Sequence, residues 1–168
     1  MKKIKSLLML GICLAAFAIQ SMGQDLPEVT VVSRNYKYLK SVDNKDAAQQ
    51  VKLLERKAAV YDVKNSEYYE DDYDTYYITF YLPRGYVLAV YDQDGKLLRT
   101  AEKYKNISLP SAVSQAVVKR YPNWAISEDT YVVRYEDANG AQTTYKMQLQ
   151  NGNKRMRVKT NANGEFLD

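Results

Sequence analysis

Residue types that carry common catalytic chemistry are scarce in this sequence. Histidine is absent from all 168 residues, and the single cysteine, Cys13, lies in an apolar run near the N-terminus. These counts exclude serine–histidine and cysteine–histidine hydrolase sites and zinc sites built on histidine. Glycine-rich phosphate loops are missing too, because the seven glycines are isolated. Paired carboxylates could serve a glycosidase, but nothing in the sequence places two of them across a pocket. We therefore predict no enzymatic activity and no cofactor.

An acidic and tyrosine-rich stretch over residues 67–74 is the first candidate for binding chemistry. Its weak candidates for a metal site are Glu70, Asp71, Asp72 and Asp74, because calcium favours several oxygen ligands. The alternative, which the sequence favours, is a solvated loop between two strands with no metal. The turn at 92–95 resembles the start of a calcium loop, but its twelfth position is Lys103 and not a glutamate. A cation or small-ligand sensor built on the acidic loop is therefore the second functional hypothesis.

Tyrosine supplies the other candidate, with 16 in the chain. Along a predicted strand over 76–82, side chains alternate between two faces of a sheet. The predicted core face holds Tyr76, Ile78, Phe80 and Leu82, and the other holds Tyr77, Thr79 and Tyr81. The second set predicts an exposed aromatic patch suited to recognition, which Tyr86 and Trp124 could join, although packing explains Trp124 more readily. The alternative is that the tyrosines only cover the sheet and keep their hydroxyls in water.

The N-terminal segment, residues 1–23, has the pattern of a signal peptide. Three lysines precede an apolar run over residues 7–19, which is shorter than the roughly 20 residues that span a bilayer. The small residues Ser21 and Gly23 predict cleavage before Gln24, and an uncleaved anchor is the alternative. We therefore predict an exported protein, periplasmic or extracellular, with no stable membrane insertion after cleavage.

Cleavage would change the composition of the working chain. It removes three of the 24 basic residues, which leaves 21 basic residues against 20 acidic ones, and it also removes Cys13. A net charge near zero gives no electrostatic reason to expect nucleic acid or an anionic membrane as a partner. The mature protein would have no disulfide and no thiol nucleophile.

Hydrophobic periodicity predicts a mixture of helices and strands. In the first half we expect an edge strand at 29–32, a helix at 43–58, and strands at 59–63, 76–82, 86–91 and near Leu97. The apolar face of the helix is formed by Ala47, Val51, Leu54 and Ala58. In the second half we expect a helix that opens at Ser108 or Leu109 and stops at Pro122, then strands at 131–135, 143–149, 154–160 and 166–167.

The two halves align without gaps at an offset of 69 residues. Gly95 then falls on Gly164, Asp92 on Asn161 and Tyr76 on Tyr145. This correspondence predicts an internal duplication with repeats at 24–104 and 105–168, each ordered helix and then antiparallel strands. The alternative is two meanders that share turn chemistry.

A family resemblance rests on four features of the second half. They are Leu109-Pro110, the helix ending at Tyr121-Pro122-Asn123, the strand with Tyr145, and the closing residues 163–167. Together they resemble the secreted PepSY-like group, whose fold is related to the β-lactamase-inhibitor proteins. The resemblance covers 108–168 and extends loosely to 44–98. It implies an α+β fold, a tandem repeat with helices packed on one face of a curved antiparallel sheet, and an exported protein that binds or inhibits envelope enzymes. No functional residues are general to that group.

These observations lead to one main functional hypothesis. We predict an exported, non-enzymatic binding module that docks or restrains a cell-envelope protein through a tyrosine-rich sheet face.

Overall fold

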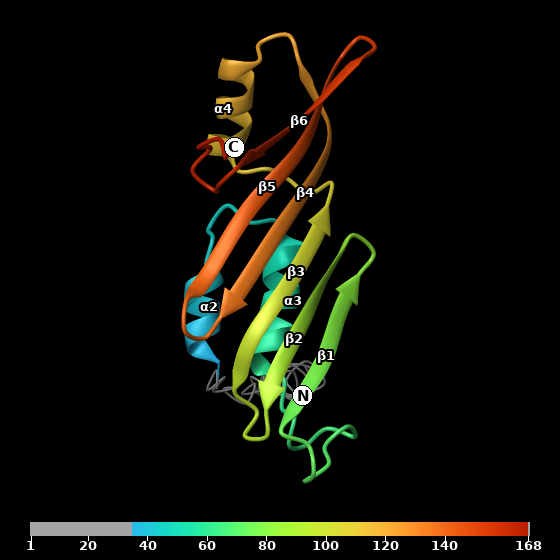
Figure 1. Cartoon of the computed structure of the whole chain (residues 1–168), viewed down its shortest axis with the longest axis vertical. Coiled ribbons are helices and arrows are strands. Elements are labelled where there is room, and N and C mark those ends of the chain that lie inside the picture. Colours follow the sequence, from blue (N-terminus) through green and yellow to red (C-terminus); the bar gives the residue numbers. More distant parts are fainter. Residues whose placement is uncertain (1–34, 168) are drawn as a thin grey trace, which may run out of the picture. The chain divides into compact units, whose positions relative to one another are not determined.

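The computed structural model describes residues 35–167. The predicted signal peptide, its cleavage site, Cys13 and the strand expected at 29–32 lie outside these residues. The described helices are α2 (Tyr36–Val42), α3 (Gln49–Val60) and α4 (Ser111–Arg120), and the strands are β1 (Thr75–Leu82), β2 (Gly85–Asp92), β3 (Leu97–Lys105), β4 (Ala125–Glu136), β5 (Gly140–Asn151) and β6 (Lys154–Thr160). The fold is therefore α+β, as predicted (Figure 1). None of the described helices is long and apolar enough to cross a membrane.

The strands form one antiparallel sheet in chain order, from β1 to β6, and the sheet is not closed. Several strands are longer than the sequence pattern indicated, β3, β4 and β5 most of all. The segment expected near Leu97 is a nine-residue strand, and 131–135 is only part of the twelve-residue β4. The inward positions of β3 include Thr100 and Glu102, which are polar but buried. Hydrophobic alternation therefore could not reveal the full length of β3.

The helices differ from their predicted bounds in the first half. The apolar face of α3 is buried as predicted at Val51, Leu54 and Ala58. The helix begins at Gln49, because a turn held by Asn44 precedes it, and it continues to Val60. The strand expected at 59–63 is therefore wrong. Helix α2 was not predicted, since its seven residues bury only Tyr38 and Val42 and give too little periodicity to detect.

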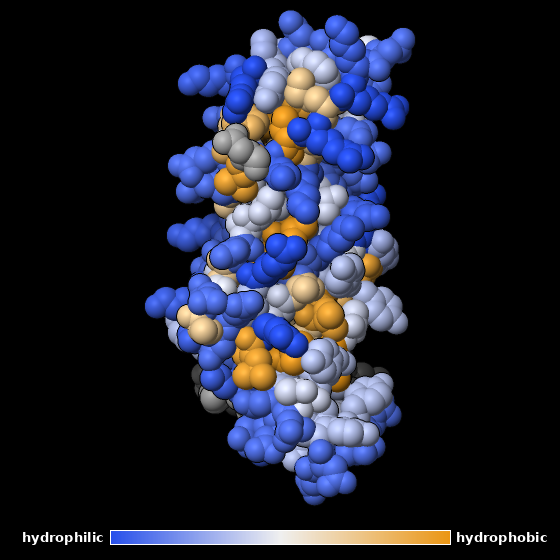
Figure 2. All heavy atoms as spheres, viewed as in Figure 1, coloured by the Kyte–Doolittle hydropathy of each residue, from blue (hydrophilic) through white to orange (hydrophobic). Residues whose placement is uncertain are grey.

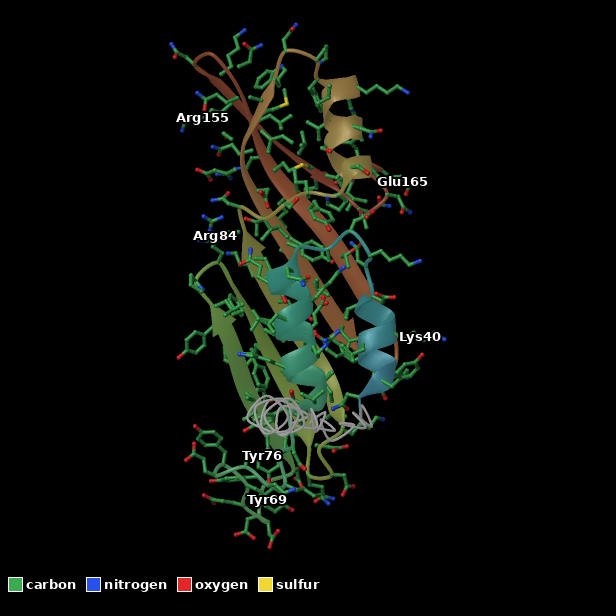
Figure 3. The ribbon with its side chains drawn as sticks, turned by 180° about the vertical axis from the view of Figure 1, so that it is seen from behind. Lys40, Tyr69, Tyr76, Arg84, Arg155 and Glu165 are labelled. Carbon is green, nitrogen blue, oxygen red and sulfur yellow. The ribbon has the colours of Figure 1, made fainter. Side chains whose placement is uncertain are left out.

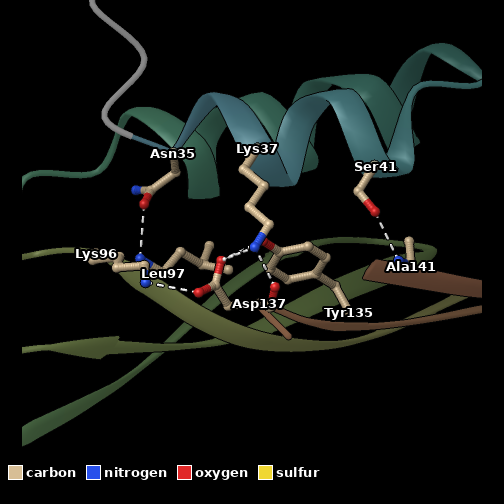
Figure 4. Close-up of polar contacts among 8 residues, drawn as sticks. All are labelled: Asn35, Lys37, Ser41, Lys96, Leu97, Tyr135, Asp137 and Ala141. Atoms are coloured by element: carbon tan, nitrogen blue, oxygen red, sulfur yellow. Dashed lines mark hydrogen bonds and ion pairs between the residues drawn. The ribbon is translucent and has the colours of Figure 1, made fainter. Parts of the chain in front are cut away.

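Both N-terminal helices contact the sheet, α2 through β4 and β5 and α3 through β1 and β2. Figures 1 and 3, which view the molecule from opposite sides, place these helices on one face of the strands. Three side chains of the α2 segment fasten it to the sheet (Figure 4). Asn35 Oδ1 accepts a 2.7 Å hydrogen bond from the Leu97 amide, and Ser41 Oγ accepts one of 2.7 Å from the Ala141 amide. Lys37 pairs with Asp137 at 3.0 Å.

Replacing Asn35 with alanine is expected to lower the free energy of unfolding by about 1–2 kcal/mol. Asn35 is buried, and it also donates from Nδ2 to the Ala59 carbonyl at 3.2 Å. The substitution would leave the buried Leu97 amide without its acceptor. Urea unfolding measures the change, and Asn153→Ala, at an exposed position in the β5–β6 turn, is the matched control. Equal losses in the two variants would contradict this role for Asn35.

Tyrosine fills much of the core between the sheet and the helices. Six tyrosines are almost completely buried, at positions 38, 91, 104, 131, 135 and 145. Three of them form one row across neighbouring strands, with Tyr131 stacked on Tyr104 and on Tyr145 at centroid distances of 5.9 and 4.4 Å. The row continues to Gly85, where an added Cβ would lie 2.3 Å from the Tyr104 ring. The expectation that the tyrosine hydroxyls stay in water is therefore wrong for this set.

Two glutamates are buried among these rings. Glu102 is 2% exposed and accepts hydrogen bonds from Tyr38, Thr100 and Tyr104 at 2.7–2.9 Å. Glu55 on α3 is 4% exposed, and its Oε1 has no hydrogen-bond partner among the described residues. Burial raises the pKa of Glu55 to about 8, and the nearby charge of Glu102 adds to the shift. Burial also raises the pKa of Glu102, while its hydrogen bonds oppose the rise.

Two hairpins of the sheet share their register at the offset of 69 residues. Tyr76 pairs with Tyr91 in β1–β2, and Tyr145 pairs with Thr160 in β5–β6. The turns that follow also correspond: Asp92 and Asn161 each accept two backbone amides through the side chain, at 2.9–3.0 Å. Gly95 and Gly164 in these turns have φ of 77° and 81°, a region that favours glycine. Turn geometry and strand register thus agree in two separate parts of the sheet.

Candidate functional site

One face of the sheet carries α2 and α3, and the described helices leave the opposite face open. Figure 2 shows this open face, where hydrophobic side chains gather over the middle of the strands and hydrophilic ones surround them. The sequence assigned Tyr76 to the core and Tyr77 and Tyr81 to the other face. The structure confirms this division, since Tyr76 is 5% exposed, Tyr77 61% and Tyr81 77%. Strand alternation alone was sufficient for this prediction.

The exposed tyrosines form what we term the aromatic patch: Tyr77, Tyr81 and Tyr86. Tyr81 and Tyr86 are direct partners across β1 and β2, and Tyr86 is 41% exposed. Directly opposed residues of an antiparallel pair point to the same face, so both side chains project from the open face. Tyr77 is linked to β3 by a 3.3 Å hydrogen bond from Arg99 to its hydroxyl. Three of the four tyrosine and tryptophan positions predicted for binding are therefore on one surface.

The fourth predicted position, Trp124, lies elsewhere. Trp124 is half-buried just before β4 and packs against the hydrophobic core. Tyr121 and Ile126, which lie on either side of it in the chain, also pack against the core. The packing interpretation of Trp124 agrees with this position.

Basic side chains are spread over the part of the open face that β3 to β6 form. Eight exposed basic side chains, which we term the basic tract, occupy its outward positions on β3 to β6: Arg99, Lys103, Lys105, Arg134, Lys146, Arg155, Arg157 and Lys159. The acidic residues at outward positions of these four strands are Glu128 and Glu136. None of the eight takes part in an ion pair within residues 35–167. Sequence reasoning missed this tract, because a near-zero net charge sums over all faces of the protein.

Some of these cations are direct neighbours. Lys146 and Lys159 are register partners across β5 and β6, and Thr130 links this row to Lys105 on β3. Like charges placed opposite each other on a sheet reduce its stability. An arrangement that costs stability without a compensating ion pair is typical of a surface kept for binding. The sequence alone could not show that Lys146 and Lys159 are opposed, because their pairing depends on the strand register.

Three shallow hollows lie along the open face and share residues. The first, of about 560 Å³, includes Tyr81, Tyr86, Lys103 and Lys105. The second, of about 330 Å³, shares Tyr86 and Lys103 with it and includes Arg134 and Lys146. The third, of about 320 Å³, shares Lys146 with the second and reaches Arg157 and Lys159. Together they make one line of depressions from the aromatic patch to β6.

The acidic loop lies at the Thr75 end of β1. Its candidate metal ligands, Glu70, Asp71, Asp72 and Asp74, are all exposed. The loop is held to the sheet through Tyr76, whose hydroxyl donates to the Glu70 carbonyl and whose ring stacks on Tyr69 at 5.6 Å (Figure 3). Within residues 35–167, no three acidic side chains gather closely enough to hold a metal ion. The geometry therefore gives no support to a cation sensor at this loop.

No family model matches the sequence, and a search of curated proteins finds no significant match. The open face of the sheet is therefore the guide to function. The face offers aromatic rings, cations and shallow hollows, which are the means of non-covalent recognition.

Proposed function

We propose that this protein is an exported binding module that docks a protein partner of the cell envelope through the open face of its sheet, without catalysing a reaction. The observation that carries the proposal is the exposure of Tyr77, Tyr81 and Tyr86 on a face that the described helices leave uncovered. Tyrosine is enriched at protein interfaces, since its ring supplies apolar contact and its hydroxyl a polar one. A partner enzyme whose active-site rim rests on this patch would be restrained by occlusion.

The export part of the proposal is supported by the N-terminal pattern of lysines, apolar run and small residues. The family part is supported by the order of elements, since α3 and α4 each precede three antiparallel strands. The shared register and turn geometry at the offset of 69 residues support a duplication. We accordingly propose a tandem, PepSY-like arrangement in which the helices cover one face and leave the other for a partner.

Replacing Tyr77 and Tyr81 together with alanine is expected to remove the partner captured from envelope extract by the chain from Gln24 onward. Truncating aromatic residues at the centre of an interface commonly costs 2 kcal/mol or more, about thirtyfold in affinity. Cross-linked partners, quantified by mass spectrometry against the wild-type protein, give the measurement.

The matched control replaces two large exposed hydrophobic side chains on the helices, Tyr36 on α2 and Leu53 on α3, with alanine. This variant is expected to keep the partner. An unchanged set of partners in the Tyr77→Ala, Tyr81→Ala variant would overturn the proposed function. Melting temperatures of both variants, which should stay close to that of the wild type, exclude unfolding as the cause.

A further inference from the structure

We propose that the ligand of the open face is an extended acidic segment of a partner protein, with its apolar end on the aromatic patch and its carboxylates on the basic tract. This inference rests on the proposed function and adds the chemistry of the partner. It depends on three features of the face: the charge, the line of hollows and the position of the apolar side chains.

The charge of the face selects an acidic ligand. The outward positions of β3 to β6 hold the eight cations of the basic tract and only two acidic residues, Glu128 and Glu136. Carboxylates that approach Lys146 and Lys159 would relieve the repulsion between two directly opposed ammonium groups. Binding would therefore gain both the new attraction and the removal of a cost already present in the free protein.

The line of hollows selects a narrow and elongated ligand. Neighbouring hollows share lining residues, first Tyr86 and Lys103 and then Lys146, so the three hollows follow one another across the strands. From β2 to β6 there are four strand intervals, or about 19 Å at roughly 4.8 Å each. An extended polypeptide advances about 3.3 Å per residue, so a segment of about six residues covers this path. A compact anion such as a lipid headgroup would contact only a small part of it.

The aromatic side chains, the largest apolar groups on the face, fix the direction of the segment. Smaller apolar residues such as Val132, Met147 and Val158 line the other hollows, but the outward aromatic rings lie at the β1–β2 end, at Tyr81 and Tyr86. At the β5–β6 end the outward side chains are Lys146, Arg157 and Lys159, with no aromatic ring among them. A segment with leucine or another apolar residue at one end and acidic residues at the other matches this order. A segment that mixes the two kinds evenly does not.

The experiment uses two short fluorescent peptides of identical composition. In one, leucines are followed by glutamates, and in the other leucines and glutamates alternate. Fluorescence anisotropy with the chain from Gln24 onward is expected to show binding of the block peptide, weakened by about 0.5 M NaCl because salt screens exposed charges. We expect the alternating peptide to bind at least several times more weakly.

Two charge-reversal variants locate the site. Lys103→Glu with Lys159→Glu changes the basic tract, while Lys40→Glu with Lys57→Glu makes the same change of net charge on α2 and α3. The first is expected to weaken binding of the block peptide at least about tenfold and the second less than about twofold. Lys159→Glu alone should weaken binding while slightly raising the melting temperature, because Lys146 then faces an opposite charge.

Several results would overturn the inference. They are no binding of the block peptide, equal binding of the two peptides, equal loss in the two charge-reversal variants, or tighter binding to phosphatidylglycerol vesicles or heparin than to the block peptide. Capture of the envelope partner distinguishes a failure of this inference from a failure of the proposed function. A partner lost in the Tyr77→Ala, Tyr81→Ala variant and kept in the Lys103→Glu, Lys159→Glu variant would preserve the docking function and reject the acidic ligand.

Discussion

Tyr131→Ala is expected to lower the free energy of unfolding by about 3–5 kcal/mol, the usual cost of removing a buried aromatic ring. Tyr131 is completely buried and lies in the middle of the row of stacked rings, between Tyr104 and Tyr145. Its loss would leave a cavity under the helices and remove two ring contacts. Because whole domains are stable by only about 5–15 kcal/mol, urea unfolding should show a large shift of the midpoint.

A second substitution at this position separates the ring from its hydroxyl. The Tyr131 hydroxyl is buried without a partner in hydrogen-bonding geometry. Burial raises the pKa of Tyr131, and the nearby Tyr145 hydroxyl adds to the rise. Tyr131→Phe is therefore expected to be neutral or stabilising, since it removes an unsatisfied polar atom and keeps the packing. Tyr77→Ala, at an exposed position on the other face, should change stability by less than about 0.5 kcal/mol. A loss in Tyr131→Phe as large as in Tyr131→Ala would contradict this account.

Strand faces and turns could be predicted from the sequence because each depends on residues that are close together in the chain. The alternation that separates Tyr76 from Tyr77 is a local property of an extended chain. The turn at Asp92 to Gly95 follows from the side-chain oxygen of Asp92 and from the positive φ that glycine tolerates. The helix face of Val113 and Val117 follows in the same way from a spacing of one turn.

What could not be predicted depends on contacts between distant segments. Helix α2 is held by tertiary contacts such as the bond from the Leu97 amide to Asn35, 62 residues apart in sequence. The burial of Glu102 depends on hydroxyls from Tyr38 and Tyr104, so its polarity concealed the inward face of β3. The pairing of Lys146 with Lys159 depends on the register of β5 and β6. A net charge near zero in the predicted mature chain therefore gave no indication of a basic face.

Glu55→Gln is expected to stabilise the protein above neutral pH and to flatten the dependence of its stability on pH. The pKa of Glu55 in the folded state is about 8, against an ordinary value of 4.5. Because the folded state binds this proton more tightly, the contribution of Glu55 to stability is complete below about pH 4.5 and is lost as the pH rises towards 8. Glutamine resembles the protonated side chain and does not titrate. At pH 8.5 the variant should be more stable than the wild type by about 2–4 kcal/mol, and near pH 4.5 the two should be similar.

Urea unfolding at several values between pH 4.5 and 8.5 provides the test, with Glu128→Gln on the open face as the exposed control. The wild type and the control should lose stability together as the pH rises, while Glu55→Gln should lose much less. Parallel profiles for all three proteins would show that Glu55 does not hold its proton in the folded state. Helix α3, which carries Glu55, packs on β1 and β2, the strands that present the aromatic patch on their other side. Ionisation of Glu55 would therefore weaken the layer beneath the proposed docking surface, so we expect partner binding in Glu55→Gln to be less sensitive to pH than in the wild type.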